Sequence, residues 1–178
     1  ELIPVNIGSL TDGKHPRIQN RVVRHGTGNI AEGPAMSREE CMQAILTGAD
    51  VVCGLKKEGY DLIVTGEMGI GNTTTSSACA AVLFDQEVET VTGRGAGLST
   101  EGLERKIRTI QKALAINHPD KNDAVDVISK VGGLDIAGMV GCYLGAAYCR
   151  MPILVDGVIA AVAAYLAGML CEAAKEYM

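Results

Sequence analysis

The residues best suited to chemistry lie in one glycine-rich run, residues 66–75 (GEMGIGNTTT). This run follows a short apolar stretch, 60–65 (YDLIVT), and leads into an alanine-rich stretch typical of a helix. Glycines let the backbone approach a ligand closely, and the unpaired N–H groups at the amino end of a helix favour anions. Three threonines add hydroxyl donors. The run therefore predicts a phosphate cradle, and the alternative is an ordinary strand-to-helix turn capped by Asn or Thr.

The loop departs from two common nucleotide-binding patterns. It lacks the Gly-Lys-Ser/Thr of a Walker A loop. Thr74 stands where the dinucleotide fingerprint has Gly or Ala. Glu67 is unusual beside a phosphate, because the two anions repel each other. We expect its carboxylate to accept a hydrogen bond from a ribose hydroxyl or to pair with a cation, and the alternative is a salt bridge that orders the loop.

A second glycine-rich loop, residues 93–97 (GRGAG), carries Arg94 and precedes a charged amphipathic helix expected over Thr100–Asn117. Arg94 and one lysine of that helix could close over a phosphate from the opposite side. The residues alone favour a solvated, salt-bridged face for each of the charged positions. These positions are Glu101, Glu104, Arg105, Lys106, Arg108 and Lys112.

Two aspartates follow apolar or glycine-rich segments. Asp156 comes directly after the run 151–155 (MPILV), which reads as a buried strand. Ligand clefts of open α/β sheets lie beyond the carboxyl ends of strands, so Asp156 is a candidate site residue or else the N-cap of the final helix. Asp135 is expected to be an N-cap. The three histidines lie in polar loops and are assigned no role.

The elements that must position these residues alternate between strand and helix. A capping box, Ser37-Arg-Glu-Glu40, predicts a helix to about Lys57 that Gly59 stops. Extended segments are predicted at 2–7, 60–65, 88–92 and 151–155, and further helices at 73–84, 100–117, 123–130, 134–149 and 157–177. This order predicts an α/β fold of three αβα layers with a mainly parallel, Rossmann-like sheet, in a single domain over residues 1–178.

The composition is that of one folded domain. The chain has 178 residues, of which 47% are hydrophobic, and a net charge of 16 − 21 = −5. An acidic chain with 3% aromatic residues lacks the basic surface and the stacking platforms that nucleic acids need. The uncharged run 157–171 is shorter than the ~20 residues of a membrane-spanning helix, which favours a buried helix.

Six cysteines occur without any C-x-x-C pair or zinc-ligand spacing with histidine. We expect them to be reduced and structural, which indicates a cytoplasmic protein, and we expect no metal site. The chain does not begin with Met. We expect it to be a fragment or a processed product.

The run 66–78 (GEMGIGNTTTSSA) resembles the signature of the nicotinate-nucleotide–dimethylbenzimidazole phosphoribosyltransferases, which make the lower nucleotide of cobalamin. Further agreement extends over nearly the whole chain, in GPAMSREE (33–40), TGRGAGLSTEGLERK (92–106), GGLDIAGMVG (132–141) and PILVDGVIAAVAA (152–164). The resemblance implies transfer of ribose phosphate from nicotinate mononucleotide to a benzimidazole nitrogen, with inversion at the anomeric carbon. It implies no metal and no organic cofactor.

The resemblance also implies roles for individual residues. Glu67 corresponds to the family's active-site glutamate in this loop, and Lys106 corresponds to its phosphate-site lysine. The positions that correspond to the two phosphate-binding loops are Gly69, Gly71, Asn72 and Thr73, and Gly93 and Gly95. Arg94 and Asp156 remain further candidates.

Family members are about twice this length, so we expect the chain to be a core piece of a longer enzyme. We expect the acceptor pocket and the general-base glutamate to lie outside it, which would leave apolar surface exposed and the isolated chain slow or inactive. The expected partners are nicotinate mononucleotide, a benzimidazole-type base and a second copy in a homodimer. The alternatives are a module that only holds a phosphate or nucleotide, and a transferase with another acceptor base or a phenol.

Overall fold

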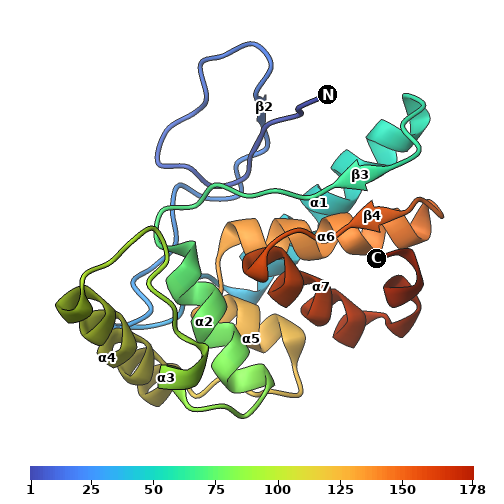
Figure 1. Ribbon diagram of the computed structural model, residues 1–178. Helices are drawn as coiled ribbons and strands as arrows, with labels where there is room; N and C mark the ends of the chain where they lie inside the picture. The colour runs from blue at the N-terminus through green and yellow to red at the C-terminus, as the bar shows by residue number, and fades with distance from the viewer.

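The computed structural model describes residues 1–178, and the chain is mostly helical (Figure 1). The α-helices are α1 (Arg38–Lys57), α2 (Asn72–Leu83), α3 (Val88–Val91), α4 (Thr100–Asn117), α5 (Ala124–Val131), α6 (Leu134–Tyr148) and α7 (Val158–Leu170). A 3-10 helix, η1 (Glu172–Tyr177), ends the chain. The strands have two residues each and are β1 (Val5–Asn6), β2 (Gln19–Asn20), β3 (Ile63–Val64) and β4 (Ile153–Leu154).

The predicted parallel pairing is present, but residues 1–178 do not form three layers around one sheet. β1 pairs in parallel with β2, and β3 pairs in parallel with β4, in two separate sheets. Each strand has one neighbour only, so no sheet is wide enough to separate two layers of helices. Helices packed on helices make the core instead.

The predicted strand at 88–92 is also wrong, because residues Val88–Val91 form helix α3. Its β-branched residues favour a strand in isolation, but strand preference depends strongly on the surroundings. Here Ser77 of α2 donates a hydrogen bond of 2.9 Å to the carbonyl of Val91, and the Thr92 hydroxyl donates one of 2.6 Å to the carbonyl of Val88. These contacts bind the segment to α2 as a helical turn.

The capping box of α1 forms as predicted. The Ser37 hydroxyl accepts from the Glu40 N–H at 3.1 Å, and the Glu40 carboxylate accepts from the Ser37 N–H at 2.9 Å. The helix ends at Lys57, and Gly59 follows with a φ of +96°. The final helix is shorter than predicted, because α7 ends at Leu170 and the chain continues as the tighter helix η1.

Helices α1 and α6 cross with their backbones almost in contact. A Cβ atom added to Gly48 would lie 1.9 Å from the carbonyl oxygen of Gly138, and one added to Gly141 would lie 1.9 Å from that of Ile45. The small residues of α6 therefore pack inside the chain, against α1. The crossing gives α6 a rigid support.

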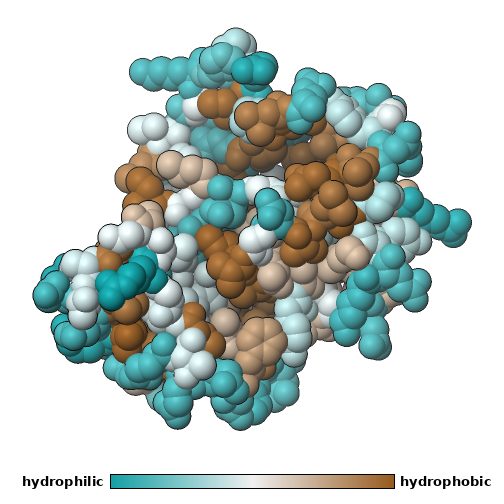
Figure 2. All heavy atoms as spheres, in the orientation of Figure 1, coloured by the Kyte–Doolittle hydropathy of each residue, from teal (hydrophilic) through white to brown (hydrophobic).

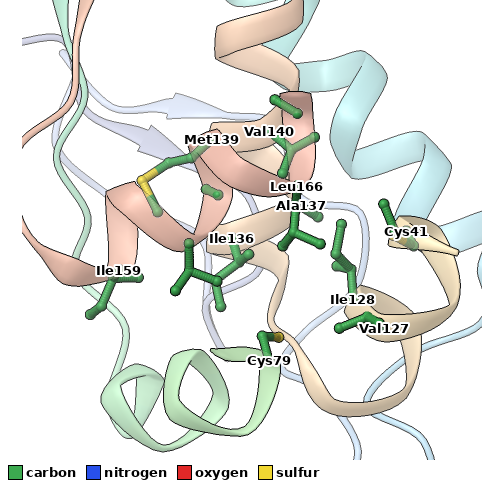
Figure 3. Packing of buried hydrophobic residues seen from close by; sticks show 14 of the residues in the cluster. Cys41, Cys79, Val127, Ile128, Ile136, Ala137, Met139, Val140, Ile159 and Leu166 are labelled. Carbon is green, nitrogen blue, oxygen red and sulfur yellow. The ribbon is translucent and has the colours of Figure 1, made fainter. Parts of the chain in front are cut away.

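The hydrophobic core lies between α1, α2, α5, α6 and α7 (Figure 3). It includes Cys79 of α2, Ile128 of α5, Ile136 and Val140 of α6, and Leu166 of α7. All six cysteines are free thiols. Burial raises the pKa of Cys41, Cys79 and Cys142 to about 12, so these thiols carry no charge near neutral pH. None of the helices combines the length and the apolar character needed to cross a bilayer.

Apolar side chains are exposed around the second sheet. Val64 of β3, Leu154 of β4 and Val158 at the start of α7 are each more than half exposed, at 57%, 51% and 68%. Figure 2 shows apolar atoms gathered on this side of the molecule. The face formed by β3, β4 and the start of α7 therefore has no cover within the chain.

Candidate functional site

Thr65, the residue between β3 and the first glycine-rich loop, is held by hydrogen bonds to two other elements. The hydroxyl groups of Thr65 and Tyr143 lie 2.6 Å apart, and the Thr65 N–H donates to the carbonyl of Leu154 at 3.3 Å. Tyr143 is fully buried on α6, and burial raises the pKa of its phenol. The carboxyl end of β3 is thus tied both to β4 and to α6.

The amino end of α2 is open to a ligand. Gly71 precedes the helix with a φ of +87°, a left-handed conformation that glycine adopts without strain. The Asn72 N–H donates to Gly69 and the Thr74 N–H to Gly71, but no backbone carbonyl accepts from the Thr73 N–H. No side chain caps the helix, so the alternative of an ordinary capped turn is wrong. A free donor remains at the positive end of the helix dipole.

The second glycine-rich loop lies against the first. Lys106 of α4 donates from its ammonium group to the Thr73 hydroxyl at 3.0 Å and to the carbonyl of Gly93 at 3.0 Å. A Cβ atom on Gly95 would lie 2.8 Å from the Thr73 hydroxyl oxygen, so the two loops need a glycine at their contact. Residues far apart in the sequence therefore meet at the amino end of α2.

Lys106 is a buried cation without a carboxylate partner. Its side chain belongs to the buried part of α4 and it is 7% exposed. It makes no salt bridge, and both of its acceptors are neutral oxygens, which leaves the third hydrogen of the ammonium group uncommitted. Desolvation lowers its pKa below the usual 10.5. An incoming anion would both complete its hydrogen bonds and balance its charge.

Arg94 makes its side-chain hydrogen bonds within the second loop and at the start of α4. Its guanidinium donates to the carbonyl of Leu98 at 2.8 Å and to the Thr100 hydroxyl at 3.3 Å. Both acceptors belong to its own loop and to the start of α4. Arg94 therefore orders the second loop, and Lys106 supplies the cation.

Two carboxylates lie on the other side of the same helix end. The side-chain amide nitrogen of Asn72 donates to the Glu67 carboxylate and, at 2.8 Å, to the Asp135 carboxylate. Glu67 makes no salt bridge, so the alternative of an ion pair that orders the loop is wrong. At the start of α2, Thr73 thus contacts the cation of Lys106, whereas its neighbour Asn72 contacts the carboxylates of Glu67 and Asp135.

Asp135 is not the predicted N-cap. Gly133 occupies that position of α6, and Asp135 lies in the first turn. Its second carboxylate oxygen accepts from the Ile136 N–H at 3.0 Å. The first glycine-rich loop passes directly over it, because a Cβ atom on Gly69 would lie 2.6 Å from the Asp135 carboxylate. The sequence predicted only a capping role for this residue, although an acidic residue two positions after a pair of glycines at a helix start was the available signal.

Asp156 lies at the same edge as the first loop. In the parallel pair, Val64 of β3 is opposite Leu154 of β4, so the residues two positions further on, Gly66 and Asp156, leave the sheet side by side. Asp156 is exposed and makes no side-chain hydrogen bond, and Gly157 is the N-cap of α7. The alternative of a capping role for Asp156 is therefore wrong. In Figure 1 the amino ends of α2, α6 and α7 lie near one another beyond this edge.

The comparisons with known proteins place the chain in a family. The whole chain, residues 1–178, matches the profile of a family described as phosphoribosyltransferase. The chain belongs to this family. It is 52% identical over its full length to the nicotinate-nucleotide–dimethylbenzimidazole phosphoribosyltransferase of Acetivibrio thermocellus and 47% identical to that of Clostridium tetani.

The chain spans about half the length of the curated relatives it matches, 51% of the Acetivibrio and 49% of the Clostridium tetani protein. It is also similar to a crystal structure of CobT from Thermus thermophilus, with a TM-score of 0.87 and 37% sequence identity. That alignment covers 97% of this chain and 51% of the Thermus chain.

Other features of the chain lie away from the glycine-rich loops. A surface hollow of about 580 Å³ is lined by residues such as Asp85, Gln86 and Lys121, near the carboxyl end of α2. It contains none of the predicted site residues. No three His, Cys, Asp or Glu side chains are close enough to hold a metal ion together.

Proposed function

We propose that the chain forms the nucleotide-binding half of an enzyme that transfers ribose 5-phosphate from nicotinate mononucleotide to 5,6-dimethylbenzimidazole, giving α-ribazole phosphate and nicotinate. The observation that carries this proposal is the ammonium group of Lys106, which is buried, lacks a counter-charge and lies between two glycine-rich loops. The names of relatives that are 46–52% identical over the whole chain support the choice of substrates.

The phosphate of nicotinate mononucleotide is placed on Lys106 and the free N–H of Thr73. Both are donors, and a charge-assisted contact of this kind is stronger than a neutral hydrogen bond. The ribose then extends toward Glu67 and Asp156, at the carboxyl ends of β3 and β4. The separation of cation and carboxylates across two adjacent residues, Asn72 and Thr73, supports this orientation.

The reaction builds positive charge on the sugar. A benzimidazole nitrogen attacks the anomeric carbon, the bond to nicotinate breaks, and the pyridine nitrogen of nicotinate keeps that electron pair. In between, the ring resembles an oxocarbenium ion, which nearby carboxylates stabilise. Glu67 is the residue we assign to this role. The proton from the second benzimidazole nitrogen passes to a base.

We place that base, and most of the acceptor pocket, outside residues 1–178. The site is open here, since Met68 and Ile70 on the first loop are 85% and 98% exposed. We further infer that β3 and β4 belong to a larger parallel sheet of αβα type in the longer chain, which would cover Val64 and Leu154. A homodimer of that longer chain is part of the same proposal.

The proposed function is tested with the full-length protein and the 178-residue chain side by side. Both are assayed with nicotinate mononucleotide and dimethylbenzimidazole, and α-ribazole phosphate and nicotinate are quantified by chromatography. We expect turnover by the full-length protein and weak nucleotide binding with little or no turnover by the short chain. Comparable turnover numbers would place the base inside this chain, with Glu67 as the first residue to replace.

Two further results would redirect the proposal. A full-length protein that binds nicotinate mononucleotide but transfers nothing would be a nucleotide-binding module. One that forms a product only with another base or with a phenol would be a related transferase with a different acceptor. A crystal structure with bound nicotinate mononucleotide whose phosphate lies away from Thr73 and Lys106 would contradict the phosphate assignment.

A further inference from the structure

We propose that Asp135 is a positioning residue, which holds the Asn72 amide and through it orients the Glu67 carboxylate. This inference rests on the proposed function, because it assigns a purpose to the orientation of Glu67. It concerns a residue that makes no hydrogen bond with Lys106 or with the loop that carries Gly93.

The Glu67 side chain has few contacts that fix its position. This residue is exposed on the first loop, between Gly66 and Gly69, and its side chain has a single hydrogen-bond partner, the Asn72 amide nitrogen. A carboxylate on such a loop has many accessible rotamers. Whatever fixes the Asn72 amide therefore determines the direction of the Glu67 carboxylate.

Asn72 has one further contact that fixes its amide. The amide nitrogen carries two hydrogens, one for Glu67 and one for Asp135, where the distance is 2.8 Å. The flipped orientation would turn the amide oxygen toward two carboxylates and is therefore unfavourable. Without Asp135, the amide has a single partner left, on the exposed loop, and nothing else selects its orientation.

Asp135 itself is held in place from several sides. It lies between two buried residues, Leu134 and Ile136, in the first turn of α6, and one of its oxygens accepts from the Ile136 N–H. Helix α6 is packed against α1 with almost no space between the backbones. A carboxylate on such a support can define the geometry of a loop, because sites on rigid elements are held more accurately than sites on loops.

The test uses the full-length protein and steady-state kinetics with nicotinate mononucleotide. We expect Asp135→Ala to lower kcat about 10- to 100-fold while KM for the nucleotide stays within about threefold, as small misplacements of reacting groups do. Asp135→Asn keeps an acceptor oxygen for Asn72, and we expect it to retain most of kcat. Equal losses in the Asn and Ala variants would overturn the proposal in favour of a direct effect of the Asp135 charge.

A double-mutant cycle shows whether the effect passes through the amide. If Asp135 acts through Asn72, the variant Asp135→Ala/Asn72→Ala loses no more kcat than Asn72→Ala alone. Losses that multiply would show that the two residues act independently and would overturn the proposal. Gly69→Ala is a second way to disturb the contact, because its new methyl group would lie 2.6 Å from the Asp135 carboxylate. We expect it to lower kcat in the wild-type background and to add little to Asp135→Ala.

Controls separate this proposal from its alternatives. Glu39→Ala removes another acidic side chain from a helix first turn, in α1, and we expect kcat to be unchanged. A comparable loss in that variant would mean that the Asp135 effect is general destabilisation. Different results would contradict the proposed function itself. These are an unaltered full-length protein that makes no α-ribazole phosphate, or a Lys106→Ala variant with unchanged nucleotide binding.

Discussion

The two sides of the site are built on different supports. Lys106 belongs to a long helix, is almost fully buried, and donates to two neutral oxygens. Glu67 belongs to an exposed loop and is held by one amide. Adjacent residues of α2, Thr73 and Asn72, make the contacts to these two groups.

This difference indicates a division of tasks. The buried cation is in place before the substrate arrives, and it contacts a phosphate that does not change during the reaction. Interactions of that kind lower KM, whereas only interactions that strengthen in the transition state raise kcat. Glu67 lies where charge would develop on the sugar. Variants on the two sides should therefore differ in which kinetic constant they change.

The largest effect is expected for Glu67→Gln in the full-length protein. Loss of a charge that stabilises the transition state lowers kcat by about 10²- to 10³-fold, while KM for nicotinate mononucleotide stays within about threefold. Steady-state kinetics over a range of nucleotide concentrations provides both constants. A raised KM with unchanged kcat would place Glu67 among the binding residues and would remove the contrast between the two sides.

Lys106→Ala should have the next largest effect, on binding. A charge-assisted hydrogen bond contributes about 1.5–3 kcal/mol, which corresponds to a roughly 10- to 100-fold rise in Kd. The rise should be greater at low salt than at high salt, because ions screen the attraction. Titration calorimetry at two salt concentrations measures both. Lys112→Ala removes an exposed lysine from the same helix and serves as the control, and an unchanged Kd in Lys106→Ala would contradict the assignment.

The residues alone did not distinguish Lys106 from the other charged residues of α4. The buried positions of this helix recur at helical spacing, at 102, 106, 110, 113 and 117, and Lys106 stands within this stripe. The solvated face predicted for the other charged residues is confirmed, and Glu104 and Arg108 form a salt bridge of 3.7 Å on it. Composition treats all these residues alike. Burial in the folded chain is what separates the one inward lysine from the rest.

Other features depended on contacts that no local pattern contains. The strand-loop-helix order around 66–75 is local and was predicted, because glycines and a following alanine-rich run report backbone geometry directly. Helix α3 depends on a hydrogen bond from Ser77, and the role of Asp135 depends on Asn72, 63 residues earlier. The width of a sheet depends on how many strands pair side by side, and here each strand pairs with only one other strand.

The pH dependence of phosphate binding should be smaller than the effect of removing Lys106, and it follows from the lowered pKa of that residue. Above its pKa the ammonium group loses its proton and with it the attraction for phosphate. Affinity for nicotinate mononucleotide should therefore begin to fall at a lower pH than for a lysine with the usual pKa of 10.5. Calorimetric titrations at rising pH test this, and Lys106→Arg should move the decline to higher pH. A decline at the same pH in both proteins would assign it to another group.

Tyr143→Phe should have a modest effect on stability and tests the fixed end of β3. It removes the buried hydrogen bond to Thr65 and keeps the ring. Such a bond contributes about 1 kcal/mol to the free energy of unfolding, with a further cost when the remaining partner lies buried. Thermal unfolding should show a lower Tm. Tyr148→Phe, at an exposed position of the same helix, should leave Tm unchanged, and equal Tm values for all three proteins would show that the bond contributes nothing.

The smallest expected effect is that of Lys106→Met on stability. The pKa of Lys106 is lower in the folded protein than in the unfolded chain. At a pH between these two pKa values, the native protein therefore binds fewer protons at Lys106 than the unfolded chain does. The charged lysine therefore destabilises the fold at neutral pH, and this penalty disappears as pH rises toward 10.5. Methionine fills a similar volume without the charge, so Tm at pH 7 should be unchanged or slightly raised, and any gain should shrink at higher pH. A clear loss of Tm would show that the contacts of Lys106 with Thr73 and Gly93 support the fold, and the division between a binding cation and a catalytic carboxylate would then be incomplete.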